Sequence, residues 1–245
     1  MKIRVIESCG STNEELKGLL RGMRTDHLLP PAILALEQTA GKGRSGRNFS
    51  SPAGKGLYLS VPFELASMEE ALPIMPMASV CVCRTIEALC PAACGIKWPN
   101  DLILEGRKVC GILTELMPLE RGLFLVLGIG VNLSQEEADF PPELRNKAIS
   151  IKQACGTVIE PQSFAEALLP ALETMIKALP KGKAEYLDYY RKKCITTGKS
   201  VNVLFGESSV PRKAEALEIT EDFKLLVTWE NGDTEALTTG EVSIR

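Results

Sequence analysis

Four basic side chains lie among five glycines in one short stretch, residues 41–56, and this composition suits the binding of an anion. The basic residues are Lys42, Arg44, Arg47 and Lys55, and the glycines are Gly41, Gly43, Gly46, Gly54 and Gly56. Glycine lets a backbone approach a ligand closely, and the planar arginine fork matches a carboxylate or a phosphate. The residue types therefore predict an anion-gripping loop, although a solvated basic loop fits the composition equally well.

Residues 41–46 also read G-x-G-x-x-G, the pattern of dinucleotide-binding Rossmann proteins. That site needs a helix at the end of the loop, because the helix N-terminus holds the pyrophosphate. Here residues 48–56 are turn residues that run directly into a strand-like segment. A Walker A loop is excluded as well, because Arg47 and Asn48 stand where its lysine and its serine or threonine belong.

A second group of polar residues starts with Lys97 at the end of a short strand, followed by a Pro-Asn turn and Asp101. Lys108 follows a Glu-Gly turn signal, so a hairpin would direct both lysines to one cleft. The alternative for Lys97 is a surface lysine beside a turn. A third group, residues 128–132, ends an apolar strand with two glycines and Asn132.

The sequence offers no set of residues for nucleophilic hydrolysis. Its single histidine is His27, and it has no G-x-S-x-G elbow, which disfavours a Ser-His-Asp site. A Cys-His site would have to recruit His27 from the loop before Pro30. The chemistry that fits is transfer between two bound anions, in which positioning and charge neutralisation do most of the catalytic work.

The overall composition is ordinary for a soluble globular protein, with 245 residues, 45% of them hydrophobic and 24% charged. The net charge of −3 argues against a surface that coats nucleic acid, so an anion site must come from local clusters. The N-terminus turns charged too soon for a signal peptide. The longest apolar run is about half of the ~20 residues that span a membrane.

The eight cysteines form no C-x-x-C pair. We expect them to be reduced thiols and the protein to be cytoplasmic. Cys81, Cys83, Cys90 and Cys94 lie in or just after a predicted helix, where cysteine packs as a small apolar residue. A zinc site from these four is the less favoured alternative, since structural zinc sites use paired spacing. No metal site built from protein side chains is predicted.

Apolar periodicity predicts a chain of strands with four helices. The expected strands cover residues 3–7, 32–36, 56–63, 96–98, 102–104, 109–116 and 124–131. The expected helices are one that begins at a capping box formed by Ser11 and Glu14, and others at residues 76–89, 161–178 and 183–194. Short turns at residues 105–106 and 121–122 predict antiparallel pairing, which also speaks against a parallel Rossmann sheet.

From residue 197 the chain changes to short strands, at residues 201–205, 214–219, 224–229 and 235–237, with a hairpin signal at Asn231 and Gly232. We expect an α+β fold in which residues 1–195 form a larger domain with a mixed, largely antiparallel sheet, and residues 196–245 form a small β-barrel.

Six segments, in this order, resemble a known family. They are residues 11–13 (S-T-N), 37–47 (E-Q-T-A-G-K-G-R-S-G-R), 97–102 (K-W-P-N-D-L), 107–113 (R-K-V-C-G-I-L), 128–132 (G-I-G-V-N) and 240–245 (G-E-V-S-I-R). The chain resembles the biotin protein ligases, also called biotin–[acetyl-CoA-carboxylase] ligases, essentially from end to end. The K-W-P-N-D-L segment and the basic glycine loop are highly specific for that family.

The resemblance implies a catalytic domain related to class II aminoacyl-tRNA synthetases and a C-terminal SH3-like barrel. It also implies two half-reactions: the carboxylate of biotin attacks the α-phosphate of Mg-ATP to give biotinyl-5′-AMP, and a lysine of a biotin carboxyl carrier protein then takes the biotin. The substrates are ATP and biotin, and Mg²⁺ is expected to bind mainly through the ATP phosphates and water, because the sequence shows no carboxylate cage.

The resemblance also implies roles for individual residues. Lys97 and Arg44 match the catalytic cations, with Lys97 near the carboxylate and the α-phosphate. The ATP and adenylate positions are matched by Arg44, Arg47, Phe49, Lys97, Lys108 and Asn132. The biotin positions are matched by Ser11, Thr12, Asn13, Gln38, Lys42, Gly43, Arg44, Lys97 and Gly111.

Two positions depart from the family pattern. Lys42 replaces the commoner arginine, which matters little if its backbone makes the contact. Phe49 stands where an aromatic residue, often tryptophan, stacks on adenine, so stacking survives with a smaller area.

The resemblance leads to further expectations about partners. The family's bifunctional members carry a winged helix-turn-helix before the catalytic domain. This sequence begins with the catalytic domain, so we expect a monofunctional ligase without DNA binding or membrane association. The partner is a carrier domain of a biotin-dependent carboxylase or decarboxylase, and a homodimer is compatible with the resemblance. The alternatives are a lipoate or octanoate ligase of the same fold, and a non-catalytic module that senses biotinyl-AMP.

Overall fold

The computed structural model describes residues 1–23, 28–179, 182–205 and 210–244, so His27 lies outside the described residues. The strands are β1 (Ile3–Cys9), β2 (Ala32–Gln38), β3 (Gly56–Leu65), β4 (Gly95–Lys97), β5 (Asp101–Leu104), β6 (Arg107–Leu119), β7 (Gly122–Asn132), β8 (Lys199–Leu204), β9 (Arg212–Ile219), β10 (Leu225–Trp229), β11 (Thr234–Leu237) and β12 (Glu241–Ile244). The helices are α1 (Thr12–Gly22), α2 (Ile74–Leu89), α3 (Ile151–Cys155), α4 (Pro161–Ala178) and α5 (Lys183–Lys193), and short 3-10 turns are η1 (Arg44–Gly46), η2 (Met68–Ala71), η3 (Glu137–Asp139) and η4 (Pro142–Leu144).

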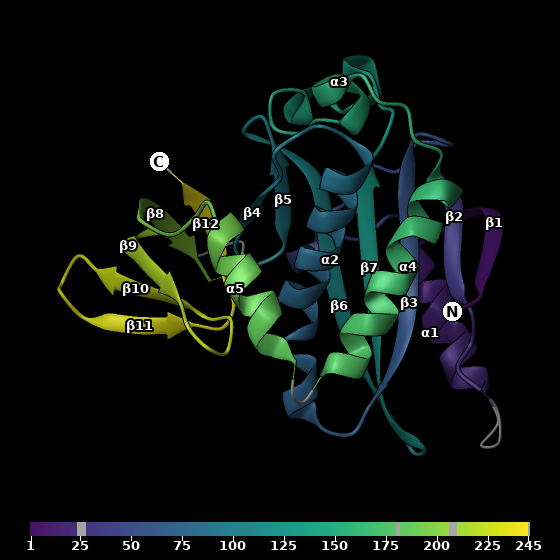
Figure 1. Cartoon of the computed structure of the whole chain (residues 1–245), viewed down its shortest axis with the longest axis horizontal. Coiled ribbons are helices and arrows are strands. Elements are labelled where there is room, and N and C mark those ends of the chain that lie inside the picture. Colours follow the sequence, from purple (N-terminus) through teal and green to yellow (C-terminus); the bar gives the residue numbers. More distant parts are fainter. Residues whose placement is uncertain (24–27, 180–181, 206–209, 245) are drawn as a thin grey trace.

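A seven-stranded sheet in the order β1-β2-β3-β7-β6-β5-β4 forms the centre of the larger unit (Figure 1). Only β1 and β2 pair in parallel in this sheet, and its other neighbours pair antiparallel. The turn between β5 and β6 places Glu105 and Gly106 at positive φ, of 48° and 74°, as a tight hairpin requires. The predicted mixed α+β fold with a largely antiparallel sheet is therefore confirmed.

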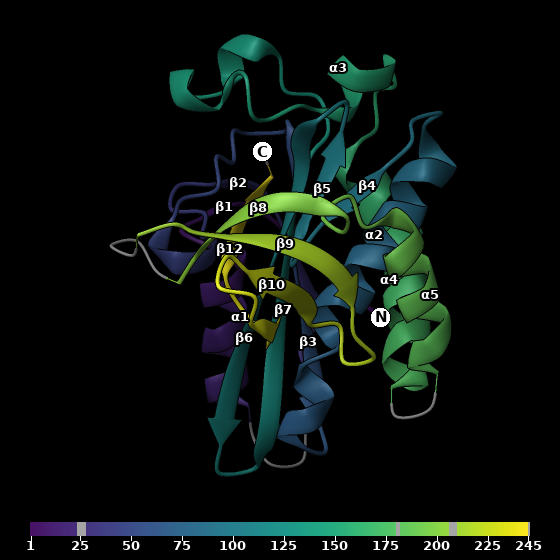
Figure 2. The same cartoon turned by 90° about the vertical axis from the view of Figure 1, so that its left-hand side faces the viewer.

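Helices cover both faces of this sheet, α1 on one face and α2 and α4 on the other (Figures 1 and 2). Leu16 and Leu20 of α1 are completely buried against Phe124 and Val126 of β7. Each buried leucine of this kind contributes on the order of 2 kcal/mol to folding. This packing holds the N-terminus of α1, and with it Ser11, against the middle of the sheet.

The segment Met68–Leu89 is long and apolar enough to cross a membrane by length and composition alone, and it is the one such helix in the described ranges. Most of it is buried inside the protein. Its helix α2 buries Met77, Cys81 and Ile86 in the main core. The apolar composition is accounted for by this core packing.

A second sheet, in the order β11-β10-β9-β8-β12, follows at the C-terminal end. It lies beside β4 and α5 (Figure 1), where the Trp98 indole donates a hydrogen bond to the Phe223 carbonyl at 3.0 Å. The predicted hairpin at Asn231 and Gly232 joins β10 to β11, with Gly232 at a φ of 88°.

Three local predictions were wrong or incomplete. Ser11 is the N-cap of α1, but its side chain makes no capping hydrogen bond, because the carboxylate of Glu14 pairs with Lys17 and Lys42 instead of closing a capping box. Helix α3 and strand β12 were not predicted. Both are short, and tertiary contacts rather than local periodicity stabilise such elements.

Candidate active site

A cavity of about 680 Å³ opens on the face of the large sheet that α1 covers, and it extends to the C-terminal sheet. Its lining contains every residue that the resemblance matched to a biotin or ATP position: Ser11, Thr12, Asn13, Gln38, Lys42, Gly43, Arg44, Arg47, Phe49, Lys97, Lys108, Gly111 and Asn132. Lys55, the fourth basic residue of the glycine-rich loop, does not line it and pairs with Asp139 instead. Six basic side chains of the described residues line it, but only one carboxylate, that of Asp101. The cavity is therefore strongly suited to anions.

The register of the sheet explains how distant motifs meet. Lys97 is opposite Asp101, Asp101 is opposite Gly111, and Gly111 is opposite Gly130. Residues directly opposite one another point to the same face of a sheet, so these four form one row across the cavity floor. The two glycines leave the β6 and β7 end of this row free of side chains.

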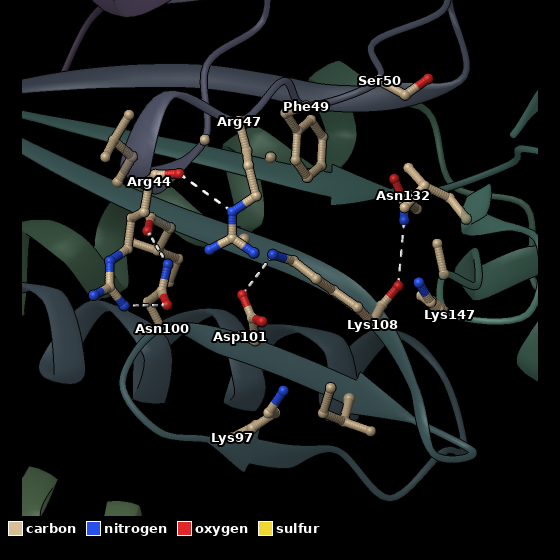
Figure 3. A pocket seen from close by; sticks show the side chains of 18 of the residues that line it. Arg44, Arg47, Phe49, Ser50, Lys97, Asn100, Asp101, Lys108, Asn132 and Lys147 are labelled. Carbon is tan, nitrogen blue, oxygen red and sulfur yellow. Dashed lines mark hydrogen bonds and ion pairs between the residues drawn. The ribbon is translucent and has the colours of Figure 1, made fainter. Parts of the chain in front are cut away.

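Phe49 lies over the glycine part of the floor (Figure 3). A Cβ atom added at Gly130 would lie 2.6 Å from the Phe49 ring, so only glycine admits the ring at this depth. The ring also meets Tyr58 edge to face, with centroids 6.5 Å apart. An aromatic face on a bare sheet floor is a suitable platform for a flat ring.

The glycine-rich loop carries its cations into the cavity without any α-helix between β2 and β3. Its single 3-10 turn, η1, contains Ser45 in the left-handed region at a φ of 53°. The predicted absence of a Rossmann helix at this point is confirmed.

Arg44 joins three parts of the structure. Its guanidinium donates to the Asn100 side-chain oxygen at 3.0 Å, to the Gly240 carbonyl at 3.1 Å and to the Thr239 hydroxyl at 3.3 Å. Asn100 is in turn fixed by donating to the Ile112 carbonyl at 2.7 Å. The turn before β12 thus helps to set the direction of Arg44.

The two predicted lysines differ in their contacts. Lys108 Nζ forms an ion pair with Asp101 Oδ1 at 2.5 Å. Lys97 Nζ has no hydrogen bond or ion pair with the residues that the structure describes (Figure 3). Lys97 is therefore a cation that a bound anion can neutralise without breaking an existing ion pair.

Asn132 ends β7 beside Lys108, and its amide is held on both sides. It donates to the carbonyls of Ile149 at 3.2 Å and Lys108 at 3.4 Å, and its oxygen accepts from the Gln135 amide at 3.1 Å. The only lining carboxylate among the described residues, Asp101, is engaged by Lys108. This donor set fits a Mg²⁺ ion carried mainly by phosphates and water rather than an all-protein cage.

Uncharged hydrogen-bonding groups make up the opposite end of the cavity. The Thr12 backbone N–H donates to Gln38 Oε1 at 2.9 Å, and Gln38 Nε2 donates to the Ser51 hydroxyl at 2.9 Å. The Ser11 hydroxyl is not used to cap α1, so it is available to a ligand. Among the described residues, no cluster of three or more His, Cys, Asp or Glu side chains could hold a metal ion.

Sequence reasoning missed several residues of this site. Asn100 was assigned to a turn, although the K-W-P-N-D-L segment contained it. The residues of β12 belong to the last of the six family segments but were given no role in the site, and Lys147 was not considered. Lys147 carries no motif, and it reaches the cavity because the Lys108 N–H donates to its carbonyl at 2.8 Å. No local pattern could have indicated these long-range contacts.

The fold and this cavity define an α+β protein whose cavity places uncharged hydrogen-bonding groups and basic side chains together on one sheet. A model of the biotin/lipoate A/B protein ligase family matches residues 11–132. A biotin–[acetyl-CoA-carboxylase] ligase of Mycobacterium tuberculosis is 30% identical over 207 residues, which cover 82% of this chain and 74% of that protein. The chain belongs to the biotin/lipoate A/B protein ligase family, on its biotin protein ligase side.

Two further comparisons describe the extent of the match. The bifunctional ligase/repressor BirA of Bacillus spizizenii is 36% identical over 143 residues, which are 58% of this chain but only 44% of that relative's length. A solved biotin protein ligase from Aquifex aeolicus, in complex with biotin and ATP, superposes with a TM-score of 0.79 and 25% identity, covering 100% of this chain and 98% of that one.

Proposed function

We propose that this protein is an ATP-dependent ligase that activates biotin to biotinyl-5′-AMP and transfers the biotin to a lysine of a biotin carboxyl carrier protein. The observation that carries the proposal is one cavity that combines uncharged hydrogen-bonding groups, at Thr12 and Gln38, with six basic side chains of the described residues. Biotin has an uncharged ureido ring and a carboxylate at opposite ends, and ATP supplies the second anion. The matched ligase of Aquifex aeolicus was solved with both molecules.

In the first half-reaction, a carboxylate oxygen of biotin attacks the α-phosphorus of ATP. The bond from that phosphorus to the β-phosphate oxygen breaks, and pyrophosphate leaves. Two anions must approach each other, so fixed cations lower the barrier. Lys97 supplies charge at the carboxylate and the α-phosphate, with Arg44 and Arg47 on the phosphate side and Lys108 in support. Mg²⁺ bound to the triphosphate supplies further charge neutralisation.

In the second half-reaction, the neutral amine of a carrier lysine attacks the carbonyl carbon of the mixed anhydride. The carbon–oxygen bond to the phosphate breaks, AMP leaves, and the amine gives up a proton. Arg44 holds the adenylate until the carrier arrives. The biotin ring rests beside four polar side chains: Ser11, Thr12, Asn13 and Gln38. The backbone of Lys42 and Gly43 and the close backbone approach at Gly111 complete its site. Phe49 stacks on adenine, and Asn132 lies near the phosphates.

The proposal includes several finer points of structure and context. Residues 1–195 form a catalytic domain of the class II aminoacyl-tRNA synthetase type, and residues 196–245 form an SH3-like barrel. The carrier belongs to a carboxylase, as the names of the relatives suggest. All eight cysteines are free thiols, which suits a reaction in the cytoplasm.

Pyrophosphate–ATP exchange tests the activity directly. We expect exchange when biotin is added, and none above background with lipoate, with octanoate or without an acid. Exchange that depends on lipoate or octanoate instead of biotin would reassign the chain to the lipoate branch of the family. No exchange with any acid, from a protein that unfolds cooperatively, would remove the adenylation chemistry altogether.

A methyl group at Gly128 tests the uncharged end of the cavity. A Cβ atom there would lie 2.4 Å from Asn13 Oδ1, so Gly128→Ala must displace the Asn13 side chain. Overpacking of this kind costs about 1–3 kcal/mol, and a loss of that size in binding is roughly 5- to 150-fold. We expect the biotin dissociation constant, measured by calorimetry, to rise within this range.

Gly18→Ala is the matched control, because Gly18 lies in α1 with no atom within 4 Å of the added Cβ. Biotin affinity in this control should equal that of the wild type. Unchanged affinity in Gly128→Ala would mean that Asn13 has no part in the biotin site.

A further inference from the structure

Two polar residues that do not line the cavity lie directly behind the residues that do. Ser60 of β3 is completely buried, and its hydroxyl lies 2.5 Å from Asn13 Oδ1 and 2.8 Å from Thr12 Oγ1. Glu115 of β6 accepts a hydrogen bond from Asn13 Nδ2 at 2.7 Å. Both are cavity-side residues of the sheet, since Ser60 is opposite Gly128 and Glu115 is two residues beyond Leu113.

Glu115 belongs to a chain of ion pairs that runs from β6 to the glycine-rich loop. Lys17 of α1 pairs with Glu115 at 2.8 Å and with Glu14 at 2.6 Å, and Glu14 also pairs with Lys42 of the glycine-rich loop. Burial alone would lower the pKa of Lys17, but its hydrogen bonds with Glu115 and Glu14 raise it. Hydrogen bonds from Lys17 and Lys42 lower the pKa of Glu14 to about 2. The charged forms of Lys17 and Glu14 are therefore the stable ones at neutral pH.

The donors and acceptors in this network restrict where each proton can lie. A carboxylate only accepts, so the Asn13 amide must turn its NH₂ group to Glu115 and its oxygen to Ser60. Ser60 has one hydroxyl proton, and the Asn13 oxygen requires it. Ser60 therefore cannot also donate to Thr12, and the Thr12 hydroxyl must give its own proton to Ser60 Oγ or to Gln38 Oε1, which lies 3.1 Å away.

With its proton used inside the protein, Thr12 Oγ1 offers only lone pairs to the cavity. We infer that Glu115 and Ser60 are positioning residues that make Thr12 a hydrogen-bond acceptor for an N–H donor of the bound ligand. The inference rests on the proposed function, in which the donor is a ureido N–H of biotin. Specificity for a ureido ring then comes from a carboxylate that never touches the ligand.

Glu115→Gln is the direct test, because it keeps the shape of the side chain and removes the constraint. A glutamine can also donate a hydrogen bond, so the Asn13 amide can exchange the positions of its NH₂ group and its oxygen. Ser60 is then free to donate its proton to Thr12 Oγ1. Ser60→Ala removes the hydroxyl that connects the Asn13 oxygen to the Thr12 hydroxyl. Lys17→Met is the matched control: it removes the ion pair with Glu115 but keeps the carboxylate.

The readout is a comparison of ligands by calorimetry, with biotin and two cyclic carbamate analogues, each with one ureido N–H replaced by an oxygen atom. We expect wild type and Lys17→Met to prefer biotin over one of the analogues about tenfold, the size of one net hydrogen bond at a buried site. In Glu115→Gln and in Ser60→Ala this preference should fall to about twofold. Thermal unfolding of each variant establishes that the protein is folded.

The possible results separate cleanly. Equal weakening for biotin and for both analogues in Glu115→Gln would mean a structural role only and would overturn the inference, as would an unchanged preference. A wild type with no preference against either analogue would also overturn it, since Thr12 would then not accept from an N–H. A wild type that does not bind biotin at all would refute the proposed function instead.

Discussion

Replacing Lys97 by alanine is expected to abolish adenylate synthesis, with a loss of about 10³-fold or more in rate, because charge stabilisation in the transition state is usually the largest catalytic contribution. Lys97 lies at the end of β4, in the row that crosses the cavity floor to Gly111 and Gly130. Its amine has no partner among the residues that the structure describes. Its charge is therefore fully available to a carboxylate and a phosphate.

The rate should be measured in a single turnover, with excess enzyme and labelled ATP, so that product release does not mask the chemical step. Lys213→Ala is the control: Lys213 is a solvent-exposed lysine of β9 that pairs with Glu230, away from the cavity. It should retain the wild-type rate. A Lys97→Ala variant that forms biotinyl-AMP at the wild-type rate would exclude Lys97 from the chemistry.

Replacing Arg44 by alanine is expected to have the second largest effect, on retention of the adenylate rather than on its synthesis. A guanidinium that is already directed by Asn100 and Gly240 can grip the phosphate of biotinyl-AMP with little loss of side-chain entropy. Loss of a charge-assisted contact of about 1.5–3 kcal/mol should speed release of the adenylate roughly 10- to 150-fold.

Release can be followed by forming labelled biotinyl-AMP on the enzyme and chasing it with unlabelled ligand. Arg84→Ala is a suitable control, because Arg84 of α2 stacks on Tyr189 and pairs with Glu185 of α5, and it does not line the cavity. An Arg44→Ala variant that keeps the wild-type release rate but synthesises no adenylate would assign Arg44 to the first half-reaction alone.

Local chemistry made much of the fold predictable from sequence. The hairpins at residues 105–106 and 231–232 follow from Gly106 and Gly232, which tolerate the positive φ that these turns require. Alternation of apolar residues located the long strands of the large sheet. The capping box failed because Glu14 has stronger partners, Lys17 and Lys42, whose approach depends on tertiary structure. Local patterns cannot include such competitors.

The same distinction applies to the candidate site. The lining residues that were matched to biotin or ATP positions stand in short motifs, and these could be read from the sequence, whereas Lys147 carries no motif. The residues that hold them in place are remote from them: Glu115 lies 102 residues from Asn13, and Gly240 lies 196 residues from Arg44. Only the register of the sheet and the position of the C-terminal strands bring these pairs together.

The contact between Arg44 and the turn at Thr239 and Gly240 limits where the chain can be divided without damage to the cavity. The wall of the cavity also includes Val242, Ser243 and Ile244 of β12. A split after residue 195 would divide the chain neatly between its two sheets, yet it would open the cavity and leave Arg44 without its backbone acceptor. For anyone who designs a minimal or split version of this protein, the smallest functional piece is therefore larger than the sheet that carries its motifs.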